Sequence, residues 1–524
     1  MENFIDKLKQ NFIIRSFVQF VNKLSGHKNV SLCVYAFTLG MLNFLRMFDN
    51  SVWGDEGLVV IACRLSFADL ISYVILNGHT PFHYVVAWSF VKVFGESGFV
   101  YHLSATLPYF IILLLSVTII KKWFGIKTSF IFITFCSLLK CSTILNLEIR
   151  VYAWCSLFCL ISFLFAYKIY FTHKFKYFVL LGIFASLAAY AHYFSLASIG
   201  LIYFGILLKI AFQYKFSKYY EYIKFFVASG TFLVLFIPWI IYVKHVKQEV
   251  ISDYHIAEAS WSSCFNFIFS SAPKFTSIFL FFLWLTIPIV YYCKKFNLFN
   301  LTKSSDSVLS INFCYNNLSF KCNCSRYIYW LLTGYFAVLG TIIASQMFSI
   351  IFFPITIDRY LYVCFIIAWL ILAIELSSIC KSKYVFAAVL TTIILLLSPY
   401  YVKTSYTEYN NNSLLSKTLS KTKSIITKKD FIYTDIVHFA WTVSESYFPK
   451  IPHQLFGHEE WWGPIELPHL EEQTTYYLFL SQPITQSIQN NLKLQNRSAD
   501  LIVDNGYIGT GAVWVYYVPA SNND

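Results

Sequence analysis

The chain has 524 residues, of which 57% are hydrophobic, 20% aromatic and only 13% charged, and its mean hydropathy is +0.58. A soluble protein carries roughly twice that charged fraction, so the composition excludes an ordinary soluble enzyme and indicates a protein of the bilayer. The net charge of +13 is spread in short lysine clusters between apolar runs, without a basic face or an RNA-binding motif, and therefore does not indicate a nucleic-acid-binding protein.

Residues 1–29 form a basic, amphipathic segment ahead of the first apolar run at 30–48. Its basic residues include Lys7, Lys9, Arg15, Lys23 and Lys28. Cytoplasmic segments beside a membrane span are enriched in lysine and arginine, so we expect a cytoplasmic N-terminus. No small-residue cleavage site follows the apolar run, which predicts an uncleaved membrane anchor.

Eleven apolar runs are long enough, at about 17 to 25 residues each, to cross a bilayer as helices. They lie near 30–48, 99–120, 128–147, 150–170, 177–193, 194–213, 224–243, 275–293, 327–350, 360–379 and 384–402. The lysine clusters between them fall on one side of the membrane only if the aromatic run at 79–95 does not cross. That run is short and carries Lys92, so we expect an interfacial helix. The predicted fold is a polytopic α-helical membrane domain over 30–402.

With this topology, the ionisable residues gather on the non-cytoplasmic face. They lie in the first outer loop at 49–98, the Glu148–Arg150 turn, the His192 turn, the loop at 244–274, and Asp358–Arg359. Ionisable groups at the membrane are costly and mark functional sites when they converge. We therefore expect a site on this face.

The first outer loop begins with an acid pair, Asp55 and Glu56, directly after the first apolar run. A general base that acts on a lipid-borne substrate needs a carboxylate where water meets the bilayer surface. About twenty residues later, His79 and Pro81 open the interfacial aromatic run. This combination predicts an enzyme that works at the membrane face.

The turn between the third and fourth central runs contains Glu148, Arg150 and Tyr152. Glu148 and Arg150 are consistent with a mutual ion pair that ties two helix ends together. They are also consistent with an arginine that neutralises a phosphate, with Tyr152 one helical turn from Glu148 on the same face. His192 stands among apolar neighbours, where a structural histidine and a ligand both remain open.

Arg359 and Tyr360 open a late apolar run, and Asp358 precedes them. Arg359 is therefore either paired with Asp358 or a second clamp for a phosphate. Cys314, Cys322 and Cys324 lie in a loop assigned to the reducing cytoplasm, and no fourth ligand with suitable spacing accompanies them, which disfavours a zinc site.

The C-terminal part, 403–524, differs in composition and is expected outside the cell membrane. Residues 413–429 are rich in Ser, Thr and Lys, which indicates a linker or a solvated helix. Strand-like runs follow at 431–434, 476–480, 501–503 and 513–518, spaced by polar stretches, and predict a small α/β domain. His458, Glu459, Glu460, Trp461 and Trp462 are either a sugar-stacking site or an amphipathic loop on the membrane surface.

The order of these motifs over about residues 30 to 380 resembles the bacterial GT-C glycosyltransferases of the protein-mannosyltransferase-like superfamily. These are relatives of the protein O-mannosyltransferases and of the aminoarabinose transferases of lipid A. The resemblance rests on the acid pair after the first span, His-x-Pro, an aromatic helix ending in Phe94-Gly95-Glu96-Ser97, Glu-x-Arg-x-Tyr-Ala, and His-Tyr-Phe. Each motif alone is weak, and their order carries the match.

The resemblance implies a hexosyl- or pentosyltransferase with a polyprenyl-phosphate-linked sugar donor, in a bacterial cytoplasmic membrane. It gives Asp55 the role of the base that deprotonates the acceptor hydroxyl, with Glu56 beside it. The residues assigned to the donor phosphate are His79, Glu148, Arg150, Tyr152, Arg359 and Tyr360. The candidate ligands of a divalent metal, the one cofactor considered, are Glu56, His79 and His192. The expected partners are the lipid-linked sugar, membrane lipids and a lipid, glycan or protein acceptor.

This chain departs from the family pattern at two positions. Thr80 stands where many relatives have the first proline of His-Pro-Pro, and Asp358 replaces the small residue or proline before Arg-Tyr. The chain also has no β-trefoil insertion between the spans, which disfavours the eukaryotic mannosyltransferase branch.

The mechanism implied is a direct displacement that inverts the anomeric configuration, because no candidate nucleophile for a retaining mechanism is present. Two other classes of function remain open. A flippase or transporter for lipid-linked sugars would be expected to have internal repeats and mid-span ionisable groups, and the sequence has no apparent repeat. A membrane scaffold whose tail binds a partner would not need the ionisable cluster.

Overall fold

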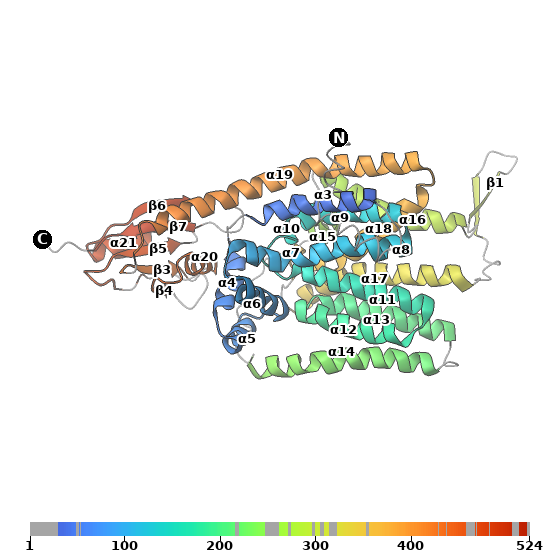
Figure 1. The fold of residues 1–524 in the computed structure, drawn as a ribbon, viewed down its shortest axis with the longest axis horizontal. Helices are drawn as coiled ribbons and strands as arrows, with labels where there is room; N and C mark the ends of the chain where they lie inside the picture. The colour runs from blue at the N-terminus through green and yellow to red at the C-terminus, as the bar shows by residue number, and fades with distance from the viewer. Residues whose placement is uncertain are drawn as a thin grey trace.

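The computed structural model has a helical bundle at one end and a small α/β domain at the other (Figure 1). It describes residues 30–48, 52, 54–214, 219–246, 261–270, 274–295, 299–303, 309–313, 322–352, 356–427, 429–435, 438–456, 467, 469–480, 483–505 and 513–520. Cys314 and the predicted sugar-stacking segment, His458 to Trp462, lie outside these residues, as do the side chains of Cys322 and Cys324.

Each apolar run is helical in the bundle, the run at 128–147 as two helices, and the predicted polytopic fold is confirmed. Seven helical segments of the described chain are long and apolar enough to cross a membrane, and further apolar helices are shorter. The helices of the bundle are α3 (Val30–Arg46), α7 (Gly98–Leu115), α8 (Lys121–Phe124), α9 (Ile126–Leu138), α10 (Lys140–Leu145), α11 (Tyr152–Thr172), α12 (Phe175–Ala191), α13 (Ser195–Tyr214), α14 (Tyr219–Val246), α15 (Trp261–Ile268), α16 (Lys274–Lys295), α17 (Cys322–Ile351), α18 (Tyr362–Ile379) and α19 (Lys383–Lys423). A π-helix, η1 (Ser116–Ile120), joins α7 to α8, and a 3-10 turn, η3 (Asp358–Leu361), precedes α18.

The predicted span at 128–147 differs from the structure, because it is divided into α9 and α10. Leu139 between them has an extended backbone, with φ −65° and ψ 143°. The backbone N–H of Lys140 donates to the carbonyl of Ser270, 2.8 Å away, instead of continuing the helix. The Ser142 hydroxyl also donates to the carbonyls of Phe135 and Leu139, so the polar groups freed by the break are satisfied.

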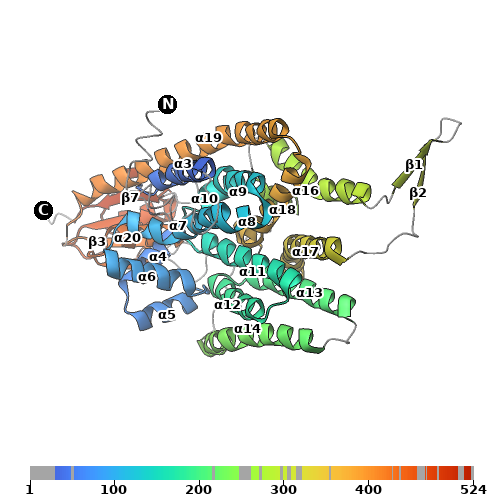
Figure 2. The ribbon, with the colours of Figure 1, turned by 45° about the vertical axis from the view of Figure 1, so that its right-hand side comes forward.

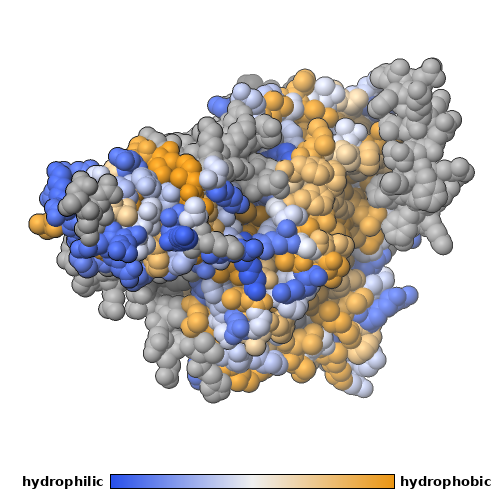
Figure 3. Space-filling model, turned by 60° about the vertical axis from the view of Figure 1, so that its left-hand side comes forward, coloured by the Kyte–Doolittle hydropathy of each residue, from blue (hydrophilic) through white to orange (hydrophobic). Residues whose placement is uncertain are grey.

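Two helices form the centre of the bundle and two lie at its edge. The apolar windows of α18 and α11 are 83% and 67% buried, whereas those of α14 and α19 are only 17% buried. The apolar side chains that α14 and α19 expose are expected to contact lipid. Hydrophobic side chains cover the bundle surface in Figure 3, while the α/β domain is largely hydrophilic.

Three short helices, α4 (Gly54–Arg64), α5 (Phe67–Leu76) and α6 (Phe82–Phe94), lie between the bundle and the α/β domain (Figures 1 and 2). Their turns are well defined: Ser66 caps α5 by accepting from the N–H of Asp69, and Gly78 and Gly95 have positive φ. At 13 residues, α6 is about 20 Å long and too short for a hydrocarbon core of about 30 Å. This position agrees with the predicted interfacial helix.

The α/β domain is reached through α19, a single helix of 41 residues. The Ser/Thr/Lys-rich stretch from 413 is therefore helical as far as Lys423. The domain has a five-stranded sheet in the order β4-β3-β5-β7-β6, in which β3 is parallel to β4 and β5, and β7 is antiparallel to β5 and β6. Its elements are β3 (Phe431–Asp435), α20 (His438–Tyr447), β4 (His453–Phe456), β5 (Tyr476–Leu480), α21 (Gln486–Leu494), β6 (Asp500–Asn505) and β7 (Val513–Val518).

The predicted strand-like runs correspond to β3, β5, β6 and β7, and β4 was not predicted. β4 has only four residues, two of them His453 and Gln454, so it lacks the apolar alternation that indicates a strand. A separate hairpin of β1 (Phe299–Lys303) and β2 (Leu309–Phe313) extends from the far end of the bundle (Figure 1).

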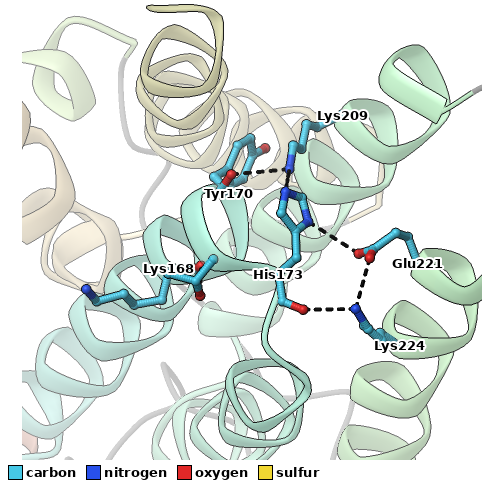
Figure 4. Close-up of polar contacts among 7 residues, drawn as sticks. Lys168, Tyr170, His173, Lys209, Glu221 and Lys224 are labelled. Carbon is cyan, nitrogen blue, oxygen red and sulfur yellow. Dashed lines mark hydrogen bonds and ion pairs between the residues drawn. The ribbon is translucent and has the colours of Figure 1, made fainter. Parts of the chain in front are cut away.

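A polar cluster lies at the C-terminal end of α11 (Figure 4). His173, in the left-handed conformation after α11, lies 3.3 Å from Glu221 and 3.2 Å from the Lys209 amine. Lys224 donates to the His173 carbonyl and pairs with Glu221 at 2.9 Å. Burial, together with the Lys209 charge, lowers the pKa of His173 to about 4. Lys209 and Lys224 also donate to the carbonyls of Tyr170 and His173, so they place positive charge at the C-terminus of α11.

Candidate active site

The acid pair lies in the first turn of α4, where the bundle meets the α/β domain. Asp55 and Glu56 are 7% and 3% exposed. A helix N-terminus favours carboxylates, because its unpaired N–H groups and the helix dipole carry partial positive charge. The chain therefore holds two buried acids at a place that stabilises their ionised form.

Two arginines from distant parts of the chain meet at Asp55. Arg359 Nη2 lies 2.7 Å from Asp55 Oδ2, and Arg150 Nη2 lies 4.0 Å from the same oxygen. Arg150 Nη1 also donates to the Asp55 backbone carbonyl at 3.0 Å. Arg359 Nη1 reaches Glu148 Oε1 at 3.8 Å. One carboxylate is thus shared by two guanidinium groups.

These contacts bear on the alternative that the sequence left open for Arg150. Arg150 pairs with Asp55, and Glu148, which pairs with Arg359, also lies within electrostatic reach of Arg150. Arg359 itself makes its short ion pair with Asp55. Both arginines therefore belong to one cluster that contains the acid pair.

Glu56 has a different task from Asp55. Its Oε1 accepts the backbone N–H of Ile149 at 2.7 Å. This bond ties the first turn of α4 to the turn that carries Glu148 and Arg150. Glu56 therefore holds the two charged segments in register with each other.

Burial and charge set the protonation of the groups around the arginines. Burial alone would lower the pKa of the Arg150 guanidinium, but the Asp55 carboxylate outweighs this and the pKa is raised well above its usual value. Burial, followed by the charges of Arg150 and Arg359, lowers the pKa of His192 to about 3. The arginines are thus cationic and His192 is neutral at physiological pH.

An aromatic wall lies beside the charged cluster. The ring of His192 lies 4.9 Å from Tyr360 and 6.1 Å from Tyr152, between ring centres, and Tyr152 lies 6.4 Å from Tyr360. Because His192 Nδ1 accepts the N–H of Phe194 at 3.2 Å, the proton of the neutral ring is on Nε2. The Tyr152 hydroxyl is buried and makes no hydrogen bond to any residue that the structure describes. A buried hydroxyl of this kind suits a ligand atom.

The His-Thr-Pro turn joins the site through Tyr84. The Tyr84 hydroxyl is 2.7 Å from His79 Nδ1, and the two rings are stacked with centres 5.6 Å apart. Tyr84 lies within electrostatic reach of Arg150. Thr80 donates to the carbonyl of Ala191 at 2.5 Å. Thr80 therefore anchors the turn to the end of α12, next to His192.

The sequence predicted the residues of this site except two on α6, Tyr84 and His83. Tyr84 was not singled out, and neither was His83, which is 1% exposed, lies against the Ile149 backbone and is near Arg150. Burial, followed by the Arg150 charge, lowers the pKa of His83 to about 3. Their spacing from His79 was the available signal, since residues four apart share a helix face. Here His79 lies just before the helix, which made that signal weak.

The predicted metal ligands do not form a shared centre. Among the residues that the structure describes, no group of three or more His, Cys, Asp and Glu side chains is arranged to hold a metal ion. Glu56 accepts from Ile149, His79 bonds to Tyr84, and His192 Nδ1 accepts from Phe194.

No protein-family model matches the sequence, and no curated protein matches it. The fold is similar to that of ArnT from Cupriavidus metallidurans in the apo state, with a TM-score of 0.59 and 10% sequence identity. The ArnT structure bound to undecaprenyl phosphate gives a TM-score of 0.58 and 11% identity. Each comparison covers 92% of this chain and 97% of ArnT. The likeness confirms the predicted GT-C fold.

Proposed function

We propose that the chain is an integral-membrane glycosyltransferase that moves a sugar from a polyprenyl-phosphate donor to an acceptor hydroxyl on the non-cytoplasmic face. The observation that carries the proposal is one buried carboxylate, Asp55, shared by Arg150 and Arg359 where the bundle meets the α/β domain. A base and two phosphate-binding cations are the groups that such a transfer needs. The similarity to an ArnT structure that binds undecaprenyl phosphate supports the lipid-linked donor.

In this mechanism, the acceptor hydroxyl gives its proton to Asp55 and its oxygen attacks the anomeric carbon. The bond from that carbon to the phosphate oxygen breaks, and the polyprenyl phosphate leaves with the electron pair. Arg150 and Arg359 meet the charge that develops on the leaving phosphate. Attack opposite the leaving group inverts the anomeric configuration.

Donor binding also explains how Asp55 becomes available as a base. In the structure both arginines contact its side chain or backbone. A donor phosphate competes for the same guanidinium groups, because phosphate and carboxylate accept the same fork of N–H donors. Transfer of the arginines toward the phosphate leaves Asp55 directed at the acceptor. The two events are thereby coupled.

The neighbouring side chains have supporting roles in the proposal. Glu56 and Glu148 orient the arginine-bearing segments, and Tyr152 and Tyr360 offer a hydroxyl and a ring surface to the donor. His192, neutral, presents its Nε2–H as a hydrogen-bond donor. His79 is assigned to the donor phosphate in this proposal, and the Tyr84 hydroxyl at 2.7 Å fixes its ring.

The proposal places the protein in a bacterial cytoplasmic membrane, with the N-terminus in the cytoplasm and the α/β domain outside. The positive-inside pattern supports this orientation. The acceptor is a lipid, a glycan or a protein. Metal dependence stays a prediction of the family resemblance, and donor turnover before and after EDTA treatment tests it.

The test is sugar release from a radiolabelled polyprenyl-phosphate sugar pool in membranes that contain the wild type, Asp55→Asn or Asp69→Asn. Asp69 is the matched control, because it is an exposed acid whose contact is the Ser66 cap of α5. We expect turnover in the wild type and Asp69→Asn and its collapse in Asp55→Asn. Turnover that survives in Asp55→Asn would move the base elsewhere. Labelled lipid that changes leaflets without turnover would support the flippase instead.

A further inference from the structure

The helix that carries the acid pair is held at both ends by a single turn of the α/β domain. Before α4, the backbone N–H of Val52 donates to the Tyr447 hydroxyl at 3.1 Å. At the last residue of α4, Arg64 Nη1 and Nη2 donate to the carbonyls of Glu445 and Ser446, both at 2.9 Å. These partners are three consecutive residues at the C-terminus of α20.

The second end of α4 is fixed in more than one direction. Arg64 Nη2 also lies 2.7 Å from Glu96 Oε1, in the loop between α6 and α7. The guanidinium therefore joins three segments: the acid helix, the end of the interfacial helix and the α/β domain. The Glu96 side chain is 43% exposed, so the ion pair itself is expected to contribute little, and the carbonyl contacts carry the connection.

Apolar packing also connects the α/β domain to the short helices. The Tyr447 ring packs against the buried core of the α/β domain and also against the core formed by α4, α5 and α6. The Lys423 amine lies 5.5 Å from the centre of that ring. Tyr447 thus contacts both cores.

The position of α4 depends on such contacts. The helix has 11 residues, below the roughly 12 to 15 needed for an isolated helix to be even marginally stable in water. Asp55 lies three residues from the Val52 bond. A shift of this helix changes the distance from Asp55 to the arginines on the bundle and to a bound donor. An error of about 1 Å in such geometry can cost about a hundredfold in rate.

From these contacts we infer that the Glu445–Tyr447 turn of the α/β domain positions the acid pair, with Tyr447 and Arg64 as its positioning residues. The inference rests on the proposed function for its catalytic consequence, while the mechanical link between the turn and α4 can be measured without activity. If the α/β domain only docked on the bundle, contacts anywhere on the bundle surface would suffice. Its contacts instead lie at both ends of α4, the helix that carries the acid pair, as positioning of that helix requires.

The decisive variant is Tyr447→Phe, which removes the hydroxyl and keeps the ring. Tyr516→Phe is the matched control, because the Tyr516 hydroxyl likewise accepts a backbone N–H, from Ile484 at 3.0 Å, but inside the α/β domain. Arg64→Met removes the second attachment, and Glu96→Gln removes only the exposed ion pair. The full-length chain is used in every case.

We expect kcat for donor turnover to fall about tenfold in Tyr447→Phe and at least as much in Arg64→Met, since orientation is lost while donor binding is not. KM for the donor should change less than about twofold, and Tyr516→Phe and Glu96→Gln should keep the wild-type kcat. Amide hydrogen exchange over 54–64 should be faster in Tyr447→Phe than in Tyr516→Phe. Wild-type kcat together with unchanged exchange in Tyr447→Phe would overturn the inference, as would equal losses in both tyrosine variants.

If the wild type turns over no donor, the proposed function fails, and hydrogen exchange alone decides the link. Faster exchange of the 54–64 amides in Tyr447→Phe, with Tyr516→Phe unchanged, would still support the positioning of α4 by the turn. Equal exchange in the two variants would overturn it.

Discussion

Arg359 offers the sharpest test of the charged cluster, because one guanidinium contacts two carboxylates. It lies 2.7 Å from Asp55 and 3.8 Å from Glu148, and these acid side chains are 10% and 5% exposed. Arg359→Gln leaves Arg150 as the arginine beside Asp55. Removing one partner of a buried ion pair costs about 3 to 5 kcal/mol, and the 26% exposure of the Arg359 side chain places this case near the lower figure.

The catalytic effect follows from the same geometry. Loss of one group that stabilises developing charge costs about 10² to 10³ in kcat, or about 3 to 4 kcal/mol. We therefore expect Arg359→Gln to lower donor turnover by about two to three orders of magnitude. Arg359→Lys keeps the charge but not the fork that reaches two acids, so its loss should be smaller, on the order of tenfold.

The assay is the rate of sugar release from labelled polyprenyl-phosphate sugar, measured with equal amounts of folded protein. Arg46→Gln is the control, since Arg46 donates to the Thr143 carbonyl at 2.8 Å and is not part of the acid cluster. Its turnover should stay within about twofold of the wild type. Full turnover in Arg359→Gln would refute the assignment of Arg359 to the leaving phosphate.

Three further predictions concern the site and the opposite end of the bundle. Glu56→Ala should lower the free energy of unfolding by about 1 to 3 kcal/mol, because it leaves the buried Ile149 N–H unsatisfied, whereas Glu56→Gln keeps an acceptor and should be milder in thermal unfolding. The pKa of His192 in the folded protein, about 3, lies below its ordinary value of about 6.5, so the folded state favours the neutral ring. The stability gained from the neutral His192 is therefore complete above pH 6.5 and is lost as the pH falls toward 3. The unfolding temperature should drop over this range, and less so in His192→Gln; equal pH profiles would contradict this. Glu221→Gln removes the recorded carboxylate partner of Lys224, so it should lower the unfolding temperature while kcat stays at the wild-type value, and a selective loss of kcat would be inconsistent with a purely structural cluster.

The sequence predicted much of this arrangement because ionisable groups are rare in a chain of this composition. Asp55, Arg150 and Arg359 stand out as charges at the ends of apolar runs, and one topology brings all three to the same face. Their convergence at a single carboxylate was not predicted, because the sequence left Glu148 and Asp358 as alternative partners of Arg150 and Arg359. The roles assigned to them remain predictions until turnover is measured.

Other features had no local pattern from which to predict them. The Val52–Tyr447 bond joins residues almost 400 positions apart, and it depends on how two cores pack rather than on a motif. The break at Leu139 depends on the carbonyl of Ser270, which lies just after the distant helix α15, while the surrounding sequence is mostly apolar apart from Lys140 and scattered Ser and Thr. Hydrophobic periodicity predicts elements well, but it carries no information about which polar group a distant segment will supply.

The central claim is that this chain transfers a sugar from a polyprenyl phosphate with Asp55 as base. It is tested most directly with purified protein in proteoliposomes that contain a labelled polyprenyl-phosphate sugar, by following release of polyprenyl phosphate and the anomeric configuration of the product. The account predicts release by the wild type with inverted configuration, and loss of release in Asp55→Asn. Retained configuration, or equal release by Asp55→Asn, would contradict it.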